Sequence, residues 1–242
     1  MQEKTRNMMV LKSKREEYDL FNKLSDEWWD ENGKFKVLHQ IRPIRIEYIL
    51  NQLNKKNIKK LDILDIGCGG GLVSESLAKL GGNITGIDFV ESNIKIAKLH
   101  AKKNGLNIKY LCKDVEKFQF NKKFDIIIAF EVLEHLDNWK DFLKNIKRNL
   151  KKNGRLIVST INRNIVSKYT AITIAENILN WIPVGTHDYD KFIKPTEIKS
   201  FLEKEGFSFK DIKGLIFNPL VNSWRLSENT SINYFSTYYK VN

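Results

Sequence analysis

The 242-residue sequence has little cysteine and no long hydrophobic run, and these shortages exclude whole classes of protein. The two cysteines, Cys68 and Cys112, are too few to staple a secreted scaffold of this size, and no cysteine–histidine spacing resembles a zinc site. No segment approaches the roughly 20 apolar residues that span a bilayer. The segment Met1–Glu17 has no apolar stretch like that of a secretory signal. We therefore expect a cytoplasmic protein that is soluble or lies on a surface.

Arginine is also scarce, although the formal net charge is +12. Lysine outnumbers arginine 33 to 8, and the lysines are scattered along the chain rather than gathered in one block. Proteins that read nucleic acid tend to concentrate arginine beside exposed aromatic residues. The composition therefore does not indicate a nucleic-acid partner. Attraction of the lysines to anionic membrane lipid remains the alternative interpretation.

Short apolar runs alternate with amphipathic segments through the middle of the chain. Helices are expected at 72–80, 93–104 and 138–150. Strands are expected at 61–66, 84–88, 108–112, 124–130 and 155–160, and two more after Phe207. Alternation at this spacing indicates right-handed βαβ units. We predict an α/β fold, a doubly wound, mostly parallel seven-stranded sheet with an antiparallel edge strand.

The chain is expected to divide into an N-terminal segment and a main domain that contains this alternation. Residues 1–57 are predicted to form an N-terminal helical segment that packs on the core, with an aromatic-rich break at 28–33. Residues 58–242 are predicted to form the main domain, with an insertion at about 161–193. Within the insertion, Ile165–Ile182 has the spacing of an amphipathic helix, which suits either a membrane interface or a lid packed on the core. The polar loop Gly185–Tyr189 follows it.

A glycine-rich segment, Asp65–Gly71, follows the first expected strand. Ligands of such sheets bind beyond the carboxyl ends of the strands. Asp88 lies 21 residues after Gly67, at the end of the next strand, where a carboxylate can accept hydrogen bonds from both hydroxyls of a ribose. The segment therefore predicts a nucleotide-like ligand. A tight strand-to-helix turn without a ligand would also explain the glycines.

The spacing of this segment distinguishes between nucleotide classes. A phosphate-binding loop requires Gly-Lys-Ser/Thr, and a dinucleotide fingerprint requires a third glycine, where this chain has Leu72. Asp65 would repel a pyrophosphate but can face an ammonium group. A ribose, an adenine and a cationic amino-acid end describe S-adenosylmethionine, and Asp114 is placed to accept from its adenine amino group. We predict cofactor contacts from Asp65, Gly67, Gly69, Asp88 and Asp114.

Glu131, Glu134 and His135 follow the fourth expected strand. If a helical turn begins here, they stand at i, i+3 and i+4 and share one face. Such a group can hold a divalent cation with open positions for substrate. Methyl transfer to a phenol needs the phenolate, which a metal ion would favour, or which His135 would generate as a general base. The alternative is purely structural, with the acids stabilising a helix start.

With these residues in view, the chain resembles the class I S-adenosylmethionine-dependent methyltransferases and, within them, the ubiquinone-biosynthesis O-methyltransferase family. The resemblance covers nearly the whole chain after the first 20 residues. It is carried by Trp28–His39, Arg42–Arg45, Asp65–Gly71, Glu131–His135, and Ser159–Asn164 with Gly185–Asp188 and Phe192–Pro195. The glycine segment marks only the superfamily, whereas Trp-Trp-Asp and Gly-Thr-His-Asp are far more specific.

The resemblance implies an enzyme that methylates 2-polyprenyl-6-hydroxyphenol and 3-demethylubiquinol. It implies that Arg45 contacts the carboxylate of S-adenosylmethionine, that the backbone at Phe130 lines the same cofactor, and that Glu131, Glu134 and His135 hold a divalent cation, Mg²⁺. It favours a peripheral position on the inner face of the plasma membrane, and partners among the other ubiquinone-biosynthesis enzymes.

Two other functions are compatible with the same residues. One is a methyltransferase for another small molecule or for RNA, although base N-methylation is disfavoured because no Asn/Asp-Pro-Pro-aromatic motif follows the fourth strand. The other is a non-catalytic membrane adaptor that retains the fold as a scaffold. The presence of Arg45, Asp88 and the acidic group argues against an adaptor.

Overall fold

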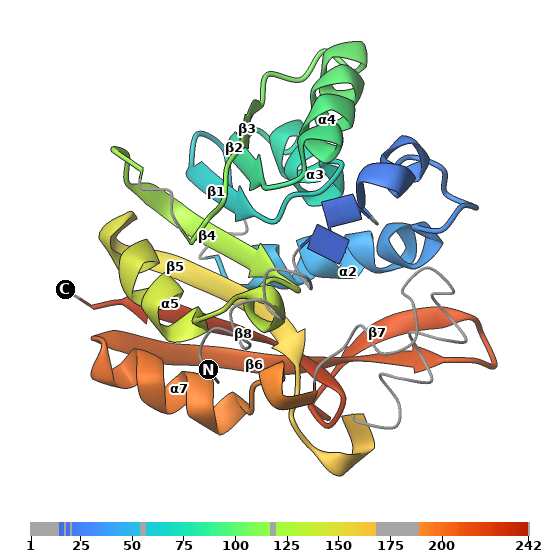
Figure 1. Ribbon diagram of the computed structural model, residues 1–242. Coiled ribbons are helices and arrows are strands. Elements are labelled where there is room, and N and C mark those ends of the chain that lie inside the picture. The colour runs from blue at the N-terminus through green and yellow to red at the C-terminus, as the bar shows by residue number, and fades with distance from the viewer. Residues whose placement is uncertain are drawn as a thin grey trace, which may run out of the picture.

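The structure, a computed structural model, describes residues 15–16, 18–19, 21–53, 57–116, 120–167 and 189–241. A single sheet crosses the molecule, and helices lie on both of its faces (Figure 1). The predicted inserted helix, apart from residues 165–167, and the loop at 185–188 lie outside the described residues. Within the described part, no helix is long and apolar enough to cross a membrane.

The sheet has eight strands in the order β3-β2-β1-β4-β5-β8-β6-β7. Their bounds are β1 Asp62–Ile66, β2 Asn83–Asp88, β3 Lys109–Cys112, β4 Phe124–Phe130, β5 Leu150–Ile161, β6 Phe207–Asn218, β7 Ser223–Ser227 and β8 Asn233–Lys240. Strands β1 to β5 are mutually parallel, whereas β8 is antiparallel to both β5 and β6, and β7 is antiparallel to β6. The predicted parallel sheet with an antiparallel edge is confirmed.

Two details of the sheet differ from the prediction. The chain after Phe207 forms three strands rather than two, so the sheet has eight strands instead of seven. Strand β5 begins at Leu150, five residues before the predicted Arg155, and the preceding helix ends at Arg148. The polar stretch 151–154 contains a left-handed Asn153, and the β4–β5 register shifts beside it, which explains why it reads as a turn in the sequence.

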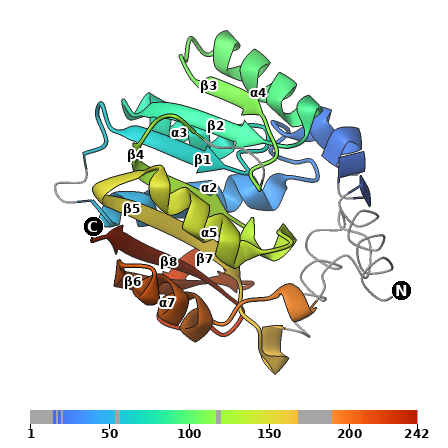
Figure 2. The same cartoon turned by 60° about the vertical axis from the view of Figure 1, so that its left-hand side comes forward.

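The helices divide between the two faces of the sheet (Figure 2). Their bounds are α2 Lys36–Asn51, α3 Leu72–Lys79, α4 Glu91–Lys103, α5 Trp139–Arg148 and α7 Pro195–Lys204. Helices α2 and α3 pack on one face with Ile126 and Ile128 of β4, whereas α5 and α7 pack on the other with Ile127 and Ala129. Because β4 is covered on both faces, its apolar run is continuous and ends at Phe130. The doubly wound arrangement is confirmed.

The segment before the sheet lies beside α3 and α4 at the carboxyl ends of β1 and β2 (Figures 1 and 2). It contains the short 3₁₀ helix η1 (Ser25–Glu27) and continues into α2. Its side chains form a small cluster in which Trp28 and Phe35 are buried against Leu72. The division of the chain at residue 57 into a helical segment and a main domain stays a prediction.

Candidate functional site

Most of the predicted site residues gather beyond the carboxyl ends of β1, β2 and β4. Asp65 and Asp88 are the penultimate residue of β1 and the last residue of β2, and Glu131 directly follows β4. Arg45 reaches the same region from α2. Asp114 follows β3, two residues beyond the Asp88–Cys112 pair of the β2–β3 ladder. The topology therefore brings the end of every one of these strands to one edge of the sheet, as expected for a ligand site of this architecture.

The glycine segment turns the chain sharply between β1 and α3. Gly67, Gly69 and Gly71 have φ values of 68°, 52° and 93°, a region that residues with a Cβ rarely adopt. The backbone N–H groups of Gly67 and Cys68 both donate to Ile87 O, at 2.8 and 3.0 Å. These bonds hold the turn against the end of β2. The predicted strand–glycine turn–helix arrangement is therefore present.

The protein's own side chains also require glycine here. A Cβ added at Gly69 would lie 2.3 Å from Trp28 Cη2, and one at Gly70 would lie 2.4 Å from Trp28 Cγ. A Cβ at Gly67 would lie 2.6 Å from Val132 Cγ2. Close packing of the turn therefore explains part of the glycine pattern without a ligand. This supports, in part, the alternative that the glycines only form a tight strand-to-helix turn.

Asp88 is buried and bonded to the glycine turn. Its Oδ2 accepts from Gly69 N at 3.0 Å, and its Oδ1 accepts from Val90 N at 2.9 Å and from Asn93 Nδ2 at 3.4 Å. A carboxylate offers about four acceptor positions, and these bonds occupy three of them. The carboxylate is therefore held in one orientation at the carboxyl end of β2.

Asp65 is a buried acid that lies near the charged Arg45 guanidinium. Ser74 Oγ donates to its Oδ2 at 2.6 Å. Burial raises the pKa of Asp65 to about 6, although the Ser74 hydrogen bond and the nearby Arg45 charge oppose this rise. At neutral pH the group is therefore a carboxylate, and it can attract an ammonium ion.

Arg45 lies among three of the predicted acids. Its Nη2 is 3.9 Å from Glu131 Oε1, and its guanidinium lies 5.3 Å from the centre of the Phe130 ring. Burial lowers its pKa, while Glu131, Asp65 and Glu134 act in the opposite direction. Among the described residues, Arg45 Nε has no hydrogen-bond partner. A buried guanidinium with an unpaired N–H suits an additional anionic ligand such as a carboxylate.

The segment after β4 differs from the predicted helical turn. Glu131 has a left-handed backbone, with φ of 53°, and its N–H donates to Ser159 O at 3.1 Å. The 3₁₀ helix η3 begins only at Leu133 and ends at His135. Glu131, Glu134 and His135 therefore do not occupy one α-helical face, because the β5 backbone captures Glu131 before the helix begins.

The two glutamates are instead held by neighbouring hydroxyl groups of β5. Ser159 Oγ donates to Glu131 Oε1 at 2.6 Å, and Thr160 Oγ1 donates to Glu134 Oε2 at 2.9 Å. Burial raises the pKa of Glu134 to about 8, and the charge of Glu131 adds to this rise. Sequence reasoning assigned no role to Ser159 and Thr160. Two hydroxyl residues directly after the apolar run Leu156–Val158 are the signal that would have indicated one.

The same geometry decides whether the predicted metal site can form. Within the described ranges, no group of three or more His, Cys, Asp or Glu side chains is arranged to hold a metal ion. One oxygen of each glutamate is already bonded to a hydroxyl. As these side chains lie, they do not fit a three-ligand cation site.

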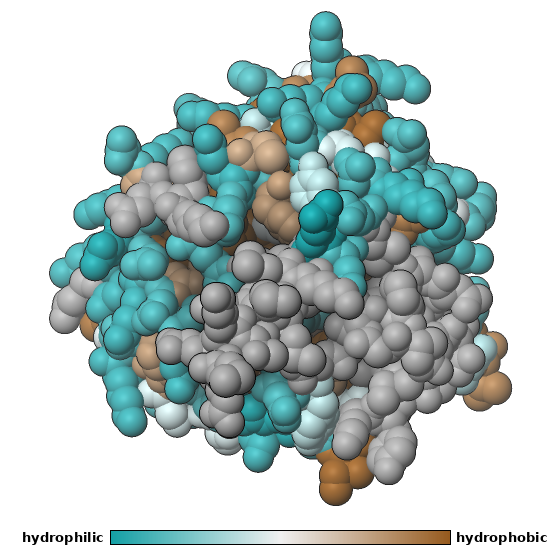
Figure 3. All heavy atoms as spheres, in the orientation of Figure 1, coloured by the Kyte–Doolittle hydropathy of each residue, from teal (hydrophilic) through white to brown (hydrophobic). Residues whose placement is uncertain are grey.

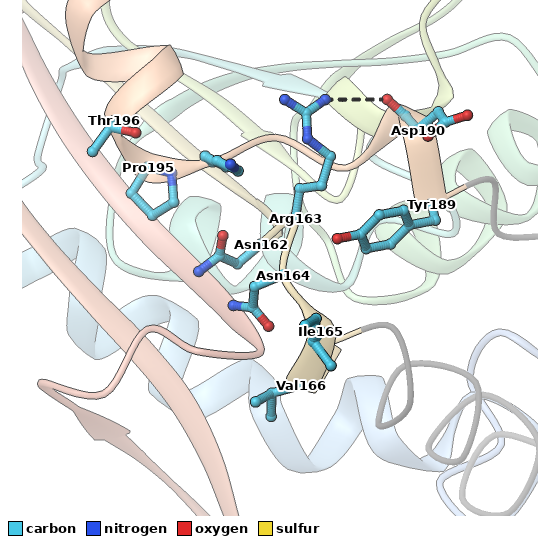
Figure 4. Close-up of a pocket in the computed structure, with 10 residues that line it drawn as sticks. Asn162, Arg163, Asn164, Ile165, Val166, Tyr189, Asp190, Pro195 and Thr196 are labelled. Atoms are coloured by element: carbon cyan, nitrogen blue, oxygen red, sulfur yellow. Dashed lines mark hydrogen bonds between the residues drawn. The ribbon is translucent and has the colours of Figure 1, made fainter.

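A cavity of about 860 Å³ opens beyond the carboxyl end of β5. Figure 4 shows Asn162 and Asn164 between Pro195 at one side and Tyr189 at the other. Arg163 donates to Asp190 O at 3.4 Å and pairs with Glu197. The cavity lies close along the strand to Ser159 and Thr160, and its lining is mixed, with Asn162, Arg163 and Asp190 beside Ile165 and Val166.

Comparison with known proteins assigns the class. Residues 64–158 match the family model described as "Methyltransferase domain". The structure is similar to magnesium protoporphyrin IX methyltransferase from Synechocystis PCC 6803 solved with bound SAH, with a TM-score of 0.67, 20% identity, and coverage of 94% of this chain and 99% of that one. The fold is that of the class I S-adenosylmethionine-dependent methyltransferases.

Relatives of higher identity narrow the assignment. The chain is 43% identical to the "Ubiquinone biosynthesis O-methyltransferase" of Rickettsia felis, over 91% of both chains. It is 44% identical to the protein of the same name from Pelagibacter ubique, over 93% of this chain and 98% of that one. The chain belongs to the ubiquinone biosynthesis O-methyltransferase family.

Proposed function

We propose that the protein transfers a methyl group from S-adenosylmethionine to a phenolic hydroxyl of polyprenylated ubiquinone precursors, at both O-methylation steps of the pathway. Family membership supports the reaction and the substrate class. The structural observation that supports it best is the buried Asp88 carboxylate, bonded to the glycine turn at the end of β2. It lies where an adenosine ribose would be recognised in this fold.

The cofactor would be bound at both of its ends. Asp88 would accept from the ribose hydroxyls, and Asp114 from the adenine amino group. Asp65 would attract the ammonium group, and Arg45 would take the carboxylate through its unpaired Nε. Gly67 and Gly69 would contact it through their backbone atoms, beside Phe130. When bound, S-adenosylmethionine supplies a methyl group on a positively charged sulfur.

The acceptor must lose its phenolic proton as its oxygen takes the methyl group. Burial raises the pKa of Glu134, so at neutral pH its ionised form, which alone can accept a proton, is less populated. His135 is only half-buried, and Glu131 is about one-third exposed and held by Ser159. We propose that the His135 imidazole accepts the phenolic proton. We also propose that Glu131 and Glu134 orient the reacting groups. In-line placement of the two reactants then supplies much of the acceleration.

Whether Glu131, Glu134 and His135 hold a divalent cation is a question for experiment. The side chains as they lie do not form a three-ligand group, so no step here uses a metal ion. A rate that chelators leave unchanged supports His135 as the base, and a rate that chelators abolish would overturn that assignment.

The decisive experiment measures methyl incorporation from labelled S-adenosylmethionine into a demethylated quinol and into RNA, with and without a chelator. The proposal expects transfer to the quinol and none to RNA. Transfer to RNA alone would favour the competing methyltransferase function. Calorimetry separates an enzyme from a membrane adaptor, because an adaptor that keeps the fold only as a scaffold would show no heat of binding with S-adenosylmethionine.

We also propose that the protein meets its lipid-tailed substrate at an anionic membrane surface, on the inner face of the plasma membrane, and near other enzymes of the pathway. The net charge of +12 supports this, as do Ile165 and Val166, which are 73% and 51% exposed at the start of the predicted inserted helix. The described residues visible in Figure 3 are mostly hydrophilic. Co-sedimentation with anionic liposomes tests the proposal. The variant Ile172→Asp should co-sediment less than the unmodified protein. Equal absence of binding in both proteins would refute it.

A further inference from the structure

The Trp28–Trp29 pair is among the most specific features of the sequence, yet the proposed reaction assigns it no role. Trp28 lies just after η1 and is 6% exposed. Its ring stacks on Phe35, with centroids 4.0 Å apart and planes 9° from parallel. The glycine turn packs against the same indole, since Cβ atoms added at Gly69 or Gly70 would overlap it. The indole is therefore fixed beside the proposed cofactor site.

Hydrogen bonds connect this indole to Asp88 through one amide. Trp28 Nε1 donates to Asn93 Oδ1 at 2.8 Å, and Asn93 Nδ2 donates to Asp88 Oδ1 at 3.4 Å. An indole N–H can only donate, and an ionised carboxylate can only accept. The Asn93 amide therefore satisfies both neighbours in one orientation alone. All three residues are buried.

We infer that Trp28 is a positioning residue for ribose recognition, which it controls by fixing Asn93 against the Asp88 carboxylate. The inference rests on the proposed binding of S-adenosylmethionine by Asp88. With Asn93 and Val90 N on Oδ1 and Gly69 N on Oδ2, the carboxylate cannot rotate freely. The carboxylate is then held in one orientation at the carboxyl end of β2, where the ribose is expected.

The test is the variant Trp28→Phe, which keeps an aromatic ring over Phe35 and removes the N–H donor. Affinity is measured by calorimetry for S-adenosylhomocysteine and for its analogue that lacks both ribose hydroxyls. We expect Trp28→Phe to weaken S-adenosylhomocysteine about three- to tenfold, the range of one modest hydrogen bond. The analogue without hydroxyls should bind the variant and the unmodified protein within about twofold.

Trp224→Phe is the matched control, because Trp224 Nε1 also donates to a side-chain amide, Gln40 Oε1, at 3.3 Å, on a different part of the molecule. It should leave both affinities unchanged. Asn93→Ala provides a second variant should Trp28→Phe fail to fold. Adding Asp88→Asn to Trp28→Phe should cost less than the sum of the two single changes, because both act on one carboxylate.

Equal weakening of both ligands by Trp28→Phe would overturn the inference, since a general loosening of the turn does not distinguish ribose hydroxyls. An additive double variant, or the same loss in Trp224→Phe, would overturn it as well. If Trp28→Phe and Asn93→Ala each bound S-adenosylhomocysteine as tightly as the unmodified protein does, this inference alone would fail. If the unmodified protein bound neither ligand, the proposed cofactor would fail with it.

Discussion

Replacing single glycines by alanine separates two costs that the glycine turn combines. Gly105, at the end of α4, has φ of 65° and open space where a Cβ would lie, so Gly105→Ala carries backbone strain alone, about 1–2 kcal/mol. Gly70 lies outside the left-handed region but faces Trp28 Cγ at 2.4 Å, so Gly70→Ala carries overpacking alone, about 1–3 kcal/mol. Gly69 has both features, which predicts a loss of about 2–5 kcal/mol for Gly69→Ala.

Different atoms of Trp28 cause the two overlaps, and this sharpens the test. A Cβ at Gly69 meets Cη2 and Cζ2 of the outer indole ring, which phenylalanine lacks, whereas a Cβ at Gly70 meets Cγ and Cβ, which phenylalanine keeps. Trp28→Phe should therefore relieve much of the loss from Gly69→Ala and little of that from Gly70→Ala. Urea unfolding followed by circular dichroism measures each free energy of unfolding. The reasoning is refuted if Gly69→Ala loses no more stability than Gly105→Ala, or if Trp28→Phe relieves both changes equally.

Three further predictions concern the proposed site. Asp88→Ala should weaken S-adenosylmethionine binding by about 1–3 kcal/mol in calorimetry, because hydrogen bonds to a charged group are lost; unchanged affinity would remove the ribose assignment. The pKa of Asp65 is about 6 rather than near 3.8, so cofactor affinity should fall as pH drops through 6 and the carboxylate is protonated. The contribution of this group to the free energy of unfolding should decline as pH rises from 4 to 6, because the folded state binds the proton more tightly than the unfolded state. Asp65→Asn should abolish both pH dependences. Glu134→Gln should lower turnover and blunt any stimulation by Mg²⁺ with cofactor affinity nearly intact, and a rate of the unmodified enzyme that never responds to Mg²⁺ or chelator would exclude the metal.

The parts of the fold that depend on local patterns were predictable. Apolar runs that end at glycine or at an acid indicated β1, β2 and β4. Strand β8 was not expected, although its run of aromatic and β-branched residues has high strand propensity. Its place in the sheet depends on β5 and β6, which are distant in the sequence.

The candidate site shows the same limit. Its residue types followed from motif and resemblance, and the fold brings Arg45, Asp65 and Glu131 to one edge of the sheet. The helical turn considered for Glu131–His135 does not begin at Glu131, because the Glu131 N–H is bonded to the backbone of Ser159, 28 residues further along. The contact between Trp28 and the glycine turn joins segments about 40 residues apart, and no local pattern encodes it.

The position of β8 between β5 and β6 affects how the molecule is made. Synthesis runs from the amino end, so β1 to β5 can pair while later residues are still on the ribosome. The hairpin of β6 and β7 emerges next, but it has no direct partner in the growing sheet, because Phe207–Lys213 pairs with residues of β8. Only when Asn233–Lys240 is released can the two halves join. Premature termination upstream of that strand would leave two open edges in place of one continuous sheet.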